Sequence, residues 1–98
     1  MSQHILSEIQ IAILITEYDL IRHARIKMAK DDLTIFDVEH AILSGKITPI
    51  ETDKERRPKY TIKGLAEDRT REVGVVGCFT KSGRYLIIRV YKLTKLEG

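Results

Sequence analysis

The spacing of the apolar residues changes from a helical period to a strand period at Lys46. Before this point, apolar side chains recur every three or four residues, which is typical of one face of a helix. After it, apolar and polar residues alternate, as in strands that bury one face. Ninety-eight residues can build one hydrophobic core but not two. The sequence therefore predicts a single α+β domain over residues 1–98, helical in residues 3–44 and a β-sheet in residues 46–93.

Three segments of the first half have helical spacing: residues 3–15, 22–30 and 34–44. The third has the clearest beginning, because Thr34 is a natural N-cap and Asp37 completes a variant of the capping box. Gly45 is expected to end this helix. Residues 18–21 fit either a short extended link or a helix.

Four segments of the second half alternate: residues 46–51, 59–64, 72–80 and 84–93. They predict three or four antiparallel strands, with the helices packed on one face of the sheet. Pro49 places the first strand at an edge. Ser82 and Gly83 fit a two-residue hairpin turn, and this register sets Phe79 opposite Leu86 on the face that meets the helices.

The same register gathers cations and aromatic rings on the other face of the sheet. These residues are Lys59, Lys63, Tyr85, Arg89 and Tyr91. Gly74 lies opposite Tyr91, which leaves one side of the tyrosine ring uncovered. Basic side chains attract phosphate and open rings stack on unpaired bases, so this face is a candidate RNA-binding surface. A half-solvated sheet face with no ligand has a similar composition, and the pattern alone favours that alternative.

The charge distribution is uneven along the chain. Residues 1–53 carry five basic and nine acidic side chains, a net charge of −4, whereas residues 54–98 carry twelve and five, a net charge of +7. An asymmetry of this kind favours an anionic partner for the basic half. A solvated surface explains it equally well.

Several classes of function lack a signature in this sequence. Cys78 is the only cysteine, and three scattered histidines do not suggest zinc, so we expect no metal site and no cofactor. The sequence contains no run of 18 apolar residues that would suggest a membrane span, and we expect a cytoplasmic protein. His23 could act as a general acid or base because histidine titrates near neutral pH. A cap or a backbone hydrogen bond explains His23 at least as well.

A set of landmarks occurs in a characteristic order along the chain: His23-Ala24, Met28, Asp37-Val38, Gly45-Lys46-Ile47, Tyr60 with Gly64, Gly83-Arg84 and Val90-Tyr91. In this order the sequence resembles a widespread prokaryotic family of small proteins that contain a domain of unknown function, related in architecture to RelE- and BrnT-like toxins. The chain departs from the family at Lys27, at Asp31-Asp32 and at Arg89, where the family has Arg, Arg-Gly and often Thr.

The resemblance implies a RelE/BrnT-like fold and a toxin of a toxin–antitoxin pair that binds single-stranded RNA. It also implies metal-free cleavage of the RNA, which we expect less strongly than binding. Under this hypothesis the catalytic residues are His23, Arg89 and Tyr91. The nucleic-acid-binding residues are then Lys59, Lys63, Arg84 and Tyr85. The alternative is a non-enzymatic interaction module whose basic face docks an acidic protein.

Two protein partners are expected as well. Residues 9–15 carry more isoleucine and leucine than one helical face buries, which suggests a homodimer through the first helix. The alternative is that this helix folds fully into its own core. A cognate antitoxin, with an acidic segment over the basic sheet face, would be the second partner.

Overall fold

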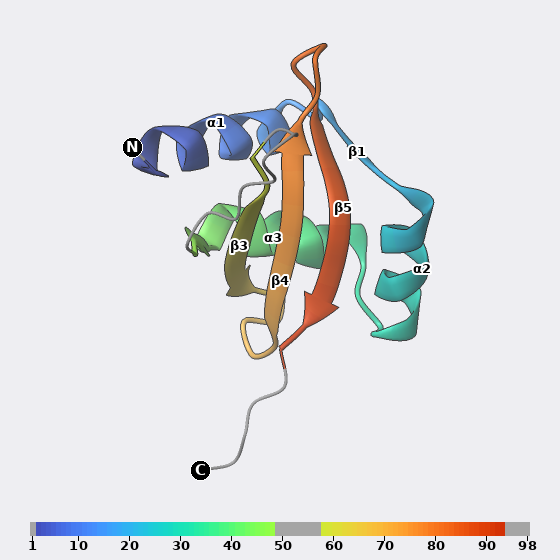
Figure 1. The fold of residues 1–98 in the computed structure, drawn as a ribbon. Coiled ribbons are helices and arrows are strands. Elements are labelled where there is room, and N and C mark those ends of the chain that lie inside the picture. The colour runs from blue at the N-terminus through green and yellow to red at the C-terminus, as the bar shows by residue number, and fades with distance from the viewer. Residues whose placement is uncertain (1, 49–57, 94–98) are drawn as a thin grey trace.

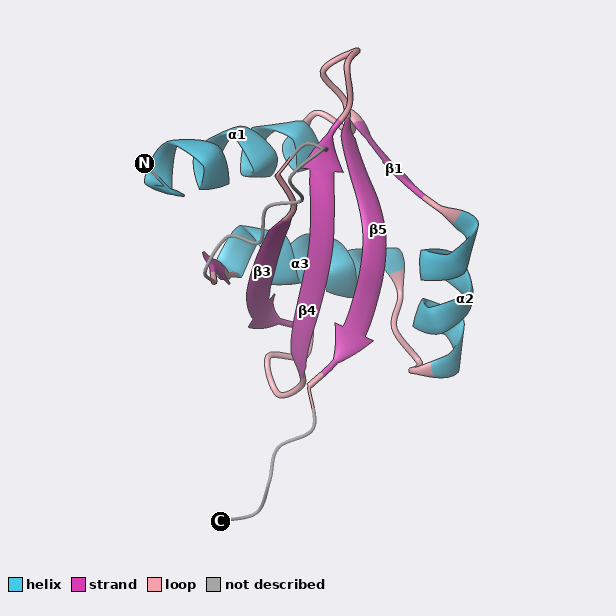
Figure 2. Ribbon diagram, viewed as in Figure 1, coloured by secondary structure: helices cyan, strands magenta, loops and turns pink. Residues whose placement is uncertain are grey.

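The structure is a computed structural model that describes residues 2–48 and 58–93. Three helices lie in the described part: α1 (Ser2–Leu14), α2 (Arg22–Lys30) and α3 (Ile35–Ser44). The strands are β1 (Tyr18–Leu20), β2 (Lys46–Ile47), β3 (Tyr60–Leu65), β4 (Glu72–Phe79) and β5 (Tyr85–Lys92). They form one five-stranded sheet in the order β1-β5-β4-β3-β2 (Figures 1 and 2). The α+β prediction is therefore confirmed. Pro49, which was predicted to mark an edge strand, lies outside the described residues.

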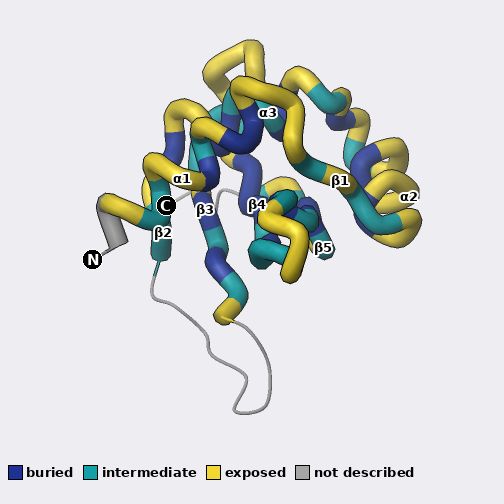
Figure 3. Tube along the Cα trace, turned by 90° about the horizontal axis from the view of Figure 1, so that it is seen from above, coloured by how far each residue is buried: buried dark blue, intermediate teal, exposed yellow. Residues whose placement is uncertain are grey.

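Helices α1 and α3 lie on one face of the sheet, and α2 lies beside β5 at the β1 edge (Figure 3). Their apolar faces and the facing side of the sheet form one hydrophobic core, as the alternation predicted. The residues at its centre include Ile9, Ala24, Val38, Ile42, Ile62, Val75 and Val90. The opposite face of the sheet carries no helix in the described part of the chain.

The sheet is mixed, so the prediction of a purely antiparallel sheet is wrong. The ambiguous segment after α1 is the strand β1, which pairs in parallel with β5 and places Tyr18 opposite Tyr85. Backbone hydrogen bonds flank this pairing, because the Tyr85 N–H donates to the Glu17 carbonyl (3.1 Å) and the Ile21 N–H donates to the Ile87 carbonyl (3.1 Å). A strand of three residues is too short to show a period, which explains why the sequence left it open.

The connection between β4 and β5 is one residue longer than predicted. The Thr80 N–H donates to the Arg84 carbonyl (2.8 Å), so that three residues form the loop, and the last of them, Gly83, has a φ of 93°. A three-residue loop with a left-handed final residue is a common hairpin connection. It pairs Phe79 with Tyr85 rather than with the following residue.

This shift overturns two predictions at the start of β5. Tyr85, expected on the open face, is fully buried in the core, and Leu86, expected in the core, is half-buried on the open face. The Tyr85 ring meets Phe79 edge-on at a centroid distance of 5.1 Å. Its burial depends on Gly77, because a Cβ there would lie 2.6 Å from the ring.

A β-bulge then restores the predicted register. Gly77 pairs with Ile87 but Val76 pairs with Arg89, so Ile88 is an extra residue on β5. Beyond the bulge, Val75 faces Val90 and Gly74 faces Tyr91, as predicted. The pairs on the two sides of the bulge therefore differ in register by one residue.

The capping box predicted at the start of α3 is present. The Asp37 N–H donates to the Thr34 hydroxyl (3.2 Å), and the Thr34 N–H donates to the Asp37 carboxylate (2.9 Å). Gly45 ends the helix as predicted, but with extended backbone rather than the left-handed conformation of a typical glycine cap. Packing requires the absence of a side chain at this position, since a Cβ there would lie 2.5 Å from the carbonyl oxygens of Ala41 and Lys63.

The contact between α3 and β3 should be sensitive to a single methyl group. A Cβ at Gly64 would overlap the Ala41 carbonyl, so Gly64→Ala is expected to lower the free energy of unfolding by about 1–3 kcal/mol through overpacking. Urea unfolding followed by circular dichroism measures this loss. Gly83→Asn is the control, because a Cβ there meets nothing within 4 Å and asparagine tolerates positive φ. Equal losses in both variants would contradict the close approach.

The buried hydroxyl of Tyr85 makes no hydrogen bond with a described residue. A buried polar group without a partner is destabilising, so Tyr85→Phe should raise the free energy of unfolding by up to about 1 kcal/mol. Tyr91→Phe, at a half-buried ring on the open face, should leave it unchanged. A fall in stability for Tyr85→Phe in the same urea titration would show that the hydroxyl is satisfied.

Candidate functional site

A groove of about 260 Å³ crosses the sheet face that the helices leave open. It is lined by Lys59, Thr61, Val76, Ile88, Arg89 and Tyr91. Strand β3 and the residue before it supply one wall, β5 supplies the other, and β4 forms the floor. The structure therefore brings together Lys59, Arg89 and Tyr91 of the candidates identified in the sequence.

The ring of Tyr91 lies across the backbone of β4. A Cβ at Gly74 would come within 2.6 Å of the Tyr91 hydroxyl and closer still to the ring carbons, so only glycine admits this orientation. The Arg89 guanidinium carbon lies 5.6 Å from the centroid of the same ring, within the range of a cation–π contact. The backbone and a cation thus hold a half-buried aromatic ring in place beside the groove.

Two further lysines extend the positive charge toward the β2 edge. Lys63 lies opposite Gly74 on one side and directly opposite Lys46 on the other. Like charges at directly opposed positions of a sheet destabilise it unless a counter-charge is present. In the described part of the chain, no carboxylate forms an ion pair with Lys46, Lys59, Lys63 or Arg89. The face is therefore suited to an anionic ligand.

Arg84 lies on the same sheet but is already paired. Its Nε and one terminal nitrogen donate to the two carboxylate oxygens of Asp19 at 2.8 and 3.1 Å, and the terminal nitrogen also donates to the Tyr18 carbonyl at 3.1 Å. The hydrogen bond from Arg84 lowers the pKa of Asp19 below its usual value. The pair joins β1 to the hairpin and neutralises this cation, so Arg84 is not an open phosphate ligand.

Two other candidates lie away from the groove. Tyr85 points into the core, where burial raises the pKa of its hydroxyl, so it cannot stack on a base. His23 is exposed on the first turn of α2 and makes no hydrogen bond with the described residues. No hydrogen bond or ion pair among the described residues joins His23 to Arg89 or Tyr91, and His23 does not line the groove, so the three predicted catalytic residues do not form an assembled acid–base pair.

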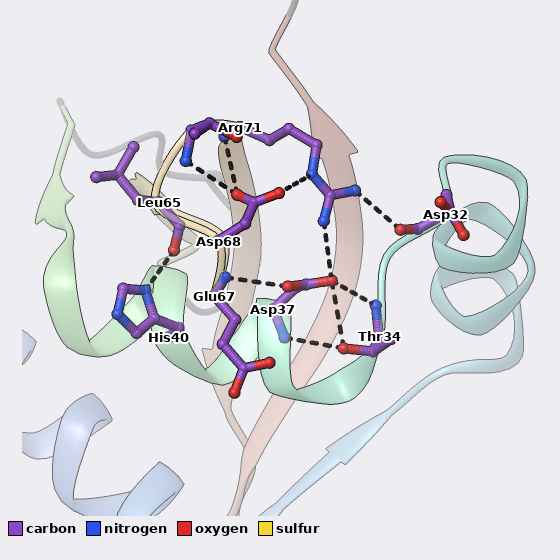
Figure 4. A network of polar contacts seen from close by, with 9 residues as sticks. Asp32, Thr34, Asp37, His40, Leu65, Glu67, Asp68 and Arg71 are labelled. Atoms are coloured by element: carbon purple, nitrogen blue, oxygen red, sulfur yellow. Dashed lines mark hydrogen bonds and ion pairs between the residues drawn. The ribbon is translucent and has the colours of Figure 1, made fainter.

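The most connected polar cluster of the molecule lies elsewhere, at the beginning of α3 (Figure 4). Asp37 is the only buried charged residue among those described, with 4% of its surface exposed. It accepts hydrogen bonds from the N–H groups of Thr34 (2.9 Å) and Glu67 (3.0 Å), and Arg71 lies 3.5 Å away. Arg71 also donates to the Asp68 carboxylate (2.9 Å). The cluster joins α3 to the β3–β4 turn.

Every part of this cluster serves the fold. Burial opposes ionisation of Asp37, but the Thr34 and Glu67 hydrogen bonds and the Arg71 charge lower the pKa of the carboxyl below its usual value. Both carboxylate oxygens accept hydrogen bonds within the cluster, and the residue is buried, so the carboxyl is not open to a substrate. The sequence predicted the Thr34 contact from the capping box, but not the contact with Glu67 thirty residues away.

The sequence missed Lys46 and Ile88 as parts of the open face. The sequence places Lys46 in a strand, but its pairing with Lys63 is a contact between segments seventeen residues apart, which local spacing does not predict. Ile88 reaches the groove because of the bulge, which has no clear local signal.

No group of three metal-ligating side chains occurs in residues 2–48 and 58–93. No helix in these two ranges is long and apolar enough to cross a membrane.

A family model described as a domain of unknown function, DUF4258, matches residues 20–92. The chain belongs to this family. No curated protein and no solved structure matches the chain. The DUF4258 region spans β1 to β5, so it includes the open face, the groove and the Asp37 cluster, whereas α1 lies before it.

The Asp37 cluster should give a specific pH dependence. Asp37→Ala leaves the Glu67 N–H without its acceptor and should lower the free energy of unfolding by about 2 kcal/mol at pH 7. Because the folded pKa is lowered, this stabilisation is fully present above the unfolded pKa of about 3.9 and is lost as the pH falls through the folded value. The difference between variant and parent should therefore be constant down to about pH 4 and shrink below it.

The control for this experiment is Glu67→Ala, which removes an exposed neighbouring carboxylate whose side chain makes no hydrogen bond with the described residues. Its effect should be small at every pH in chemical denaturation. A loss for Asp37→Ala that does not change on acidification would contradict the ionised network.

Proposed function

We propose that the open sheet face of this DUF4258 protein binds single-stranded RNA, as part of a toxin-type protein. The observation that carries the proposal is the Tyr91 ring, which lies on Gly74 in a groove that a second cation, Lys59, also lines. The ring lies beside Arg89, which forms no ion pair with a described residue. A ring held against the backbone gives a base a preorganised stacking surface. The neighbouring cation can hold the phosphate of the same nucleotide.

The spacing along β3 supports an extended nucleic-acid strand. Lys59, Thr61 and Lys63 point to the open face at alternate positions, which are about 6.6–6.8 Å apart in a strand. Three polar groups in a line can follow a phosphate backbone, with the bases directed across β4 toward Tyr91. Because Lys46 lies directly opposite Lys63, the basic surface continues to the β2 edge.

An unpaired strand fits this face better than a duplex. Stacking on Tyr91 requires a base that is not stacked on its neighbours, which occurs in single strands, loops and bulges. Val76 and Ile88 contribute apolar surface to the groove beside the cations Lys59 and Arg89. Apolar and aromatic surface between cations is typical of sites that bind bases and phosphates together.

The toxin-type assignment rests on the RelE/BrnT-like resemblance, and cleavage is its second step. In metal-free cleavage, a base removes the proton of the ribose 2′-hydroxyl, this oxygen attacks the adjacent phosphorus, and the 5′-oxygen leaves with a proton from an acid. Arg89 is suited to stabilise the phosphate charge, and His23 is the candidate base or acid. Binding remains the primary proposal, since the described residues do not bring His23 to the groove.

A second candidate function uses the same cations to dock an acidic protein without catalysis. The observation that favours it is that the predicted catalytic residues do not form an acid–base pair. The two functions differ in their need for an aromatic ring, because an acidic peptide needs the cations and not the stacking surface. Tyr91 therefore separates the two functions.

RNA binding is tested by fluorescence anisotropy with a short single-stranded RNA at low salt. The double variant Arg89→Ala, Lys63→Ala should weaken binding and lower the slope of log K against log salt by about 1.4, since each lost phosphate contact contributes about 0.7. Tyr91→Ala should weaken binding by about 1–3 kcal/mol through lost stacking, and Tyr91→Phe should not.

The matched control is Arg25→Ala, which removes one positive charge from a groove on the helical side of the molecule. Its affinity should stay close to that of the parent protein. If RNA fails to bind at low salt, or if the double variant binds unchanged, the RNA proposal is wrong. Loss with the double variant but not with Tyr91→Ala would support the docking of an acidic partner instead.

A further inference from the structure

We propose that α1 and α3 form a second binding surface, which takes an amphipathic helix of a partner protein that carries leucine-like anchors flanked by lysine or arginine. The two helices lie on one face of the sheet (Figure 3), and the groove lined by Arg89 and Tyr91 lies on the face that they leave open. We call the second binding surface the helical surface, and its apolar members are Ile11, Leu14, Ile15, Phe36 and Leu43.

The members of the helical surface are unusually open to solvent. Between 40% (Leu43) and 68% (Leu14) of each residue is exposed, although all five are large apolar residues. On α1 they lie on the side away from the core, because Ile9, Ala12 and Ile13 are the buried residues of the helix. Single exposed apolar residues are common, but a group on two adjacent helices marks an interaction site.

Hydrogen bonds place the two helices side by side. The Gln10 amide nitrogen donates to the carbonyls of Ile42 (3.2 Å) and Leu43 (3.3 Å) at the end of α3. Eight residues further along the chain, the Tyr18 hydroxyl donates to the Glu39 carboxylate. The second half of α1 and the segment after it therefore run antiparallel to α3. From this arrangement we infer that the exposed residues of the two helices share one surface.

A groove of about 340 Å³ continues this surface. It is lined by Thr16, Tyr18, Asp19, Leu20, Arg25, Met28 and Ile35. Two members of the helical surface are sequence neighbours of lining residues, because Ile15 precedes Thr16 and Phe36 follows Ile35. Leu20, Met28 and Ile35 give this groove an apolar part. Apolar surface of this kind, bordered by exposed apolar residues, suits the apolar face of an amphipathic helix, which inserts its anchors at helical spacing.

The charges of the two helices indicate the kind of partner. Neither α1 nor α3 contains a lysine or arginine, whereas Glu8 and Glu39 lie on them and Glu17 follows α1. Arg25 is the one lysine or arginine in the lining of the groove of about 340 Å³. A basic flank on the partner complements this rim, whereas a second copy of the helical surface would oppose acid with acid.

The inference goes beyond RNA binding, because neither surface shares a residue with the other. A partner on the helical surface leaves the groove at Arg89 and Tyr91 open, so one molecule can bind RNA and a protein at once. An antitoxin that covers the RNA face, as the sequence suggested, would compete with RNA instead. Competition is therefore a second difference that the experiment can measure.

The probe is a short fluorescein-labelled helical peptide of leucine and lysine, compared with a matched peptide of leucine and glutamate. The lysine peptide should bind the full chain, and the glutamate peptide should not. The double variant Leu14→Gln, Leu43→Gln should weaken binding by roughly tenfold, or about 1.4 kcal/mol. Ile26→Gln, at an exposed apolar residue of α2 outside the surface, should have no effect.

Charge reversal excludes non-specific attraction. Glu8→Lys, Glu17→Lys, at two exposed positions, should shift the preference toward the glutamate peptide. RNA affinity should be the same in the glutamine variants, which keep the net charge, so failure here is separate from failure of the RNA proposal. Circular dichroism confirms that each variant is folded, which is expected because every substituted residue is exposed.

Three results would overturn the inference. The first is equal binding of both peptides to the parent protein, and the second is lysine-peptide binding that survives Leu14→Gln, Leu43→Gln. The third is a concentration-dependent dimer in analytical ultracentrifugation that Leu14→Gln, Leu43→Gln abolishes, since a second copy would then occupy the helical surface.

Discussion

The β-bulge in β5 determines which side chains reach the open face. With the three-residue turn alone, a regular ladder would set Arg89 opposite Val75, whose side chain is fully buried in the core. An unpaired guanidinium there would be strongly destabilising. The extra residue Ile88 turns the strand by one position, so that Val90 enters the core and Arg89 and Tyr91 point to the groove. Both the core and the candidate site depend on this one insertion.

The glycines of β4 complete this arrangement on both faces of the sheet. Gly77 lies beneath the ring of Tyr85 on the core side, and Gly74 lies beneath the ring of Tyr91 on the open side. A side chain at either position would overlap a ring. The Gly74-Val75-Val76-Gly77 segment therefore lies within a strand and does not form a glycine-rich phosphate loop. It is a strand whose two glycines seat one tyrosine ring in the core and the other beside the groove.

Local signals predicted what local interactions determine. The capping box of α3, the extent of α2 and the alternation of β3 were predicted correctly, because each depends on residues a few positions apart. The start of β5 was wrong for a physical reason. Gly83 suits the last position of a three-residue loop as well as the second position of a two-residue turn, and the choice reverses the faces of Tyr85 and Leu86. The parallel pairing of β1 was missed because it is a contact between segments more than sixty residues apart.

The parallel strand also decides which cations remain available. Arg84 and Arg89 are five residues apart on one hairpin, and the sequence gives no reason to separate them. Strand β1 places Asp19 opposite Leu86, where its carboxylate holds the Arg84 guanidinium with two hydrogen bonds. Arg89, on the same hairpin, forms no ion pair with a described carboxylate, and its charge remains available to a ligand in the groove. The uncompensated charge is thus confined to the part of the sheet between β5 and β2, where the ring of Tyr91 also lies, and a ligand that offers both phosphate and an unpaired base satisfies both features at once.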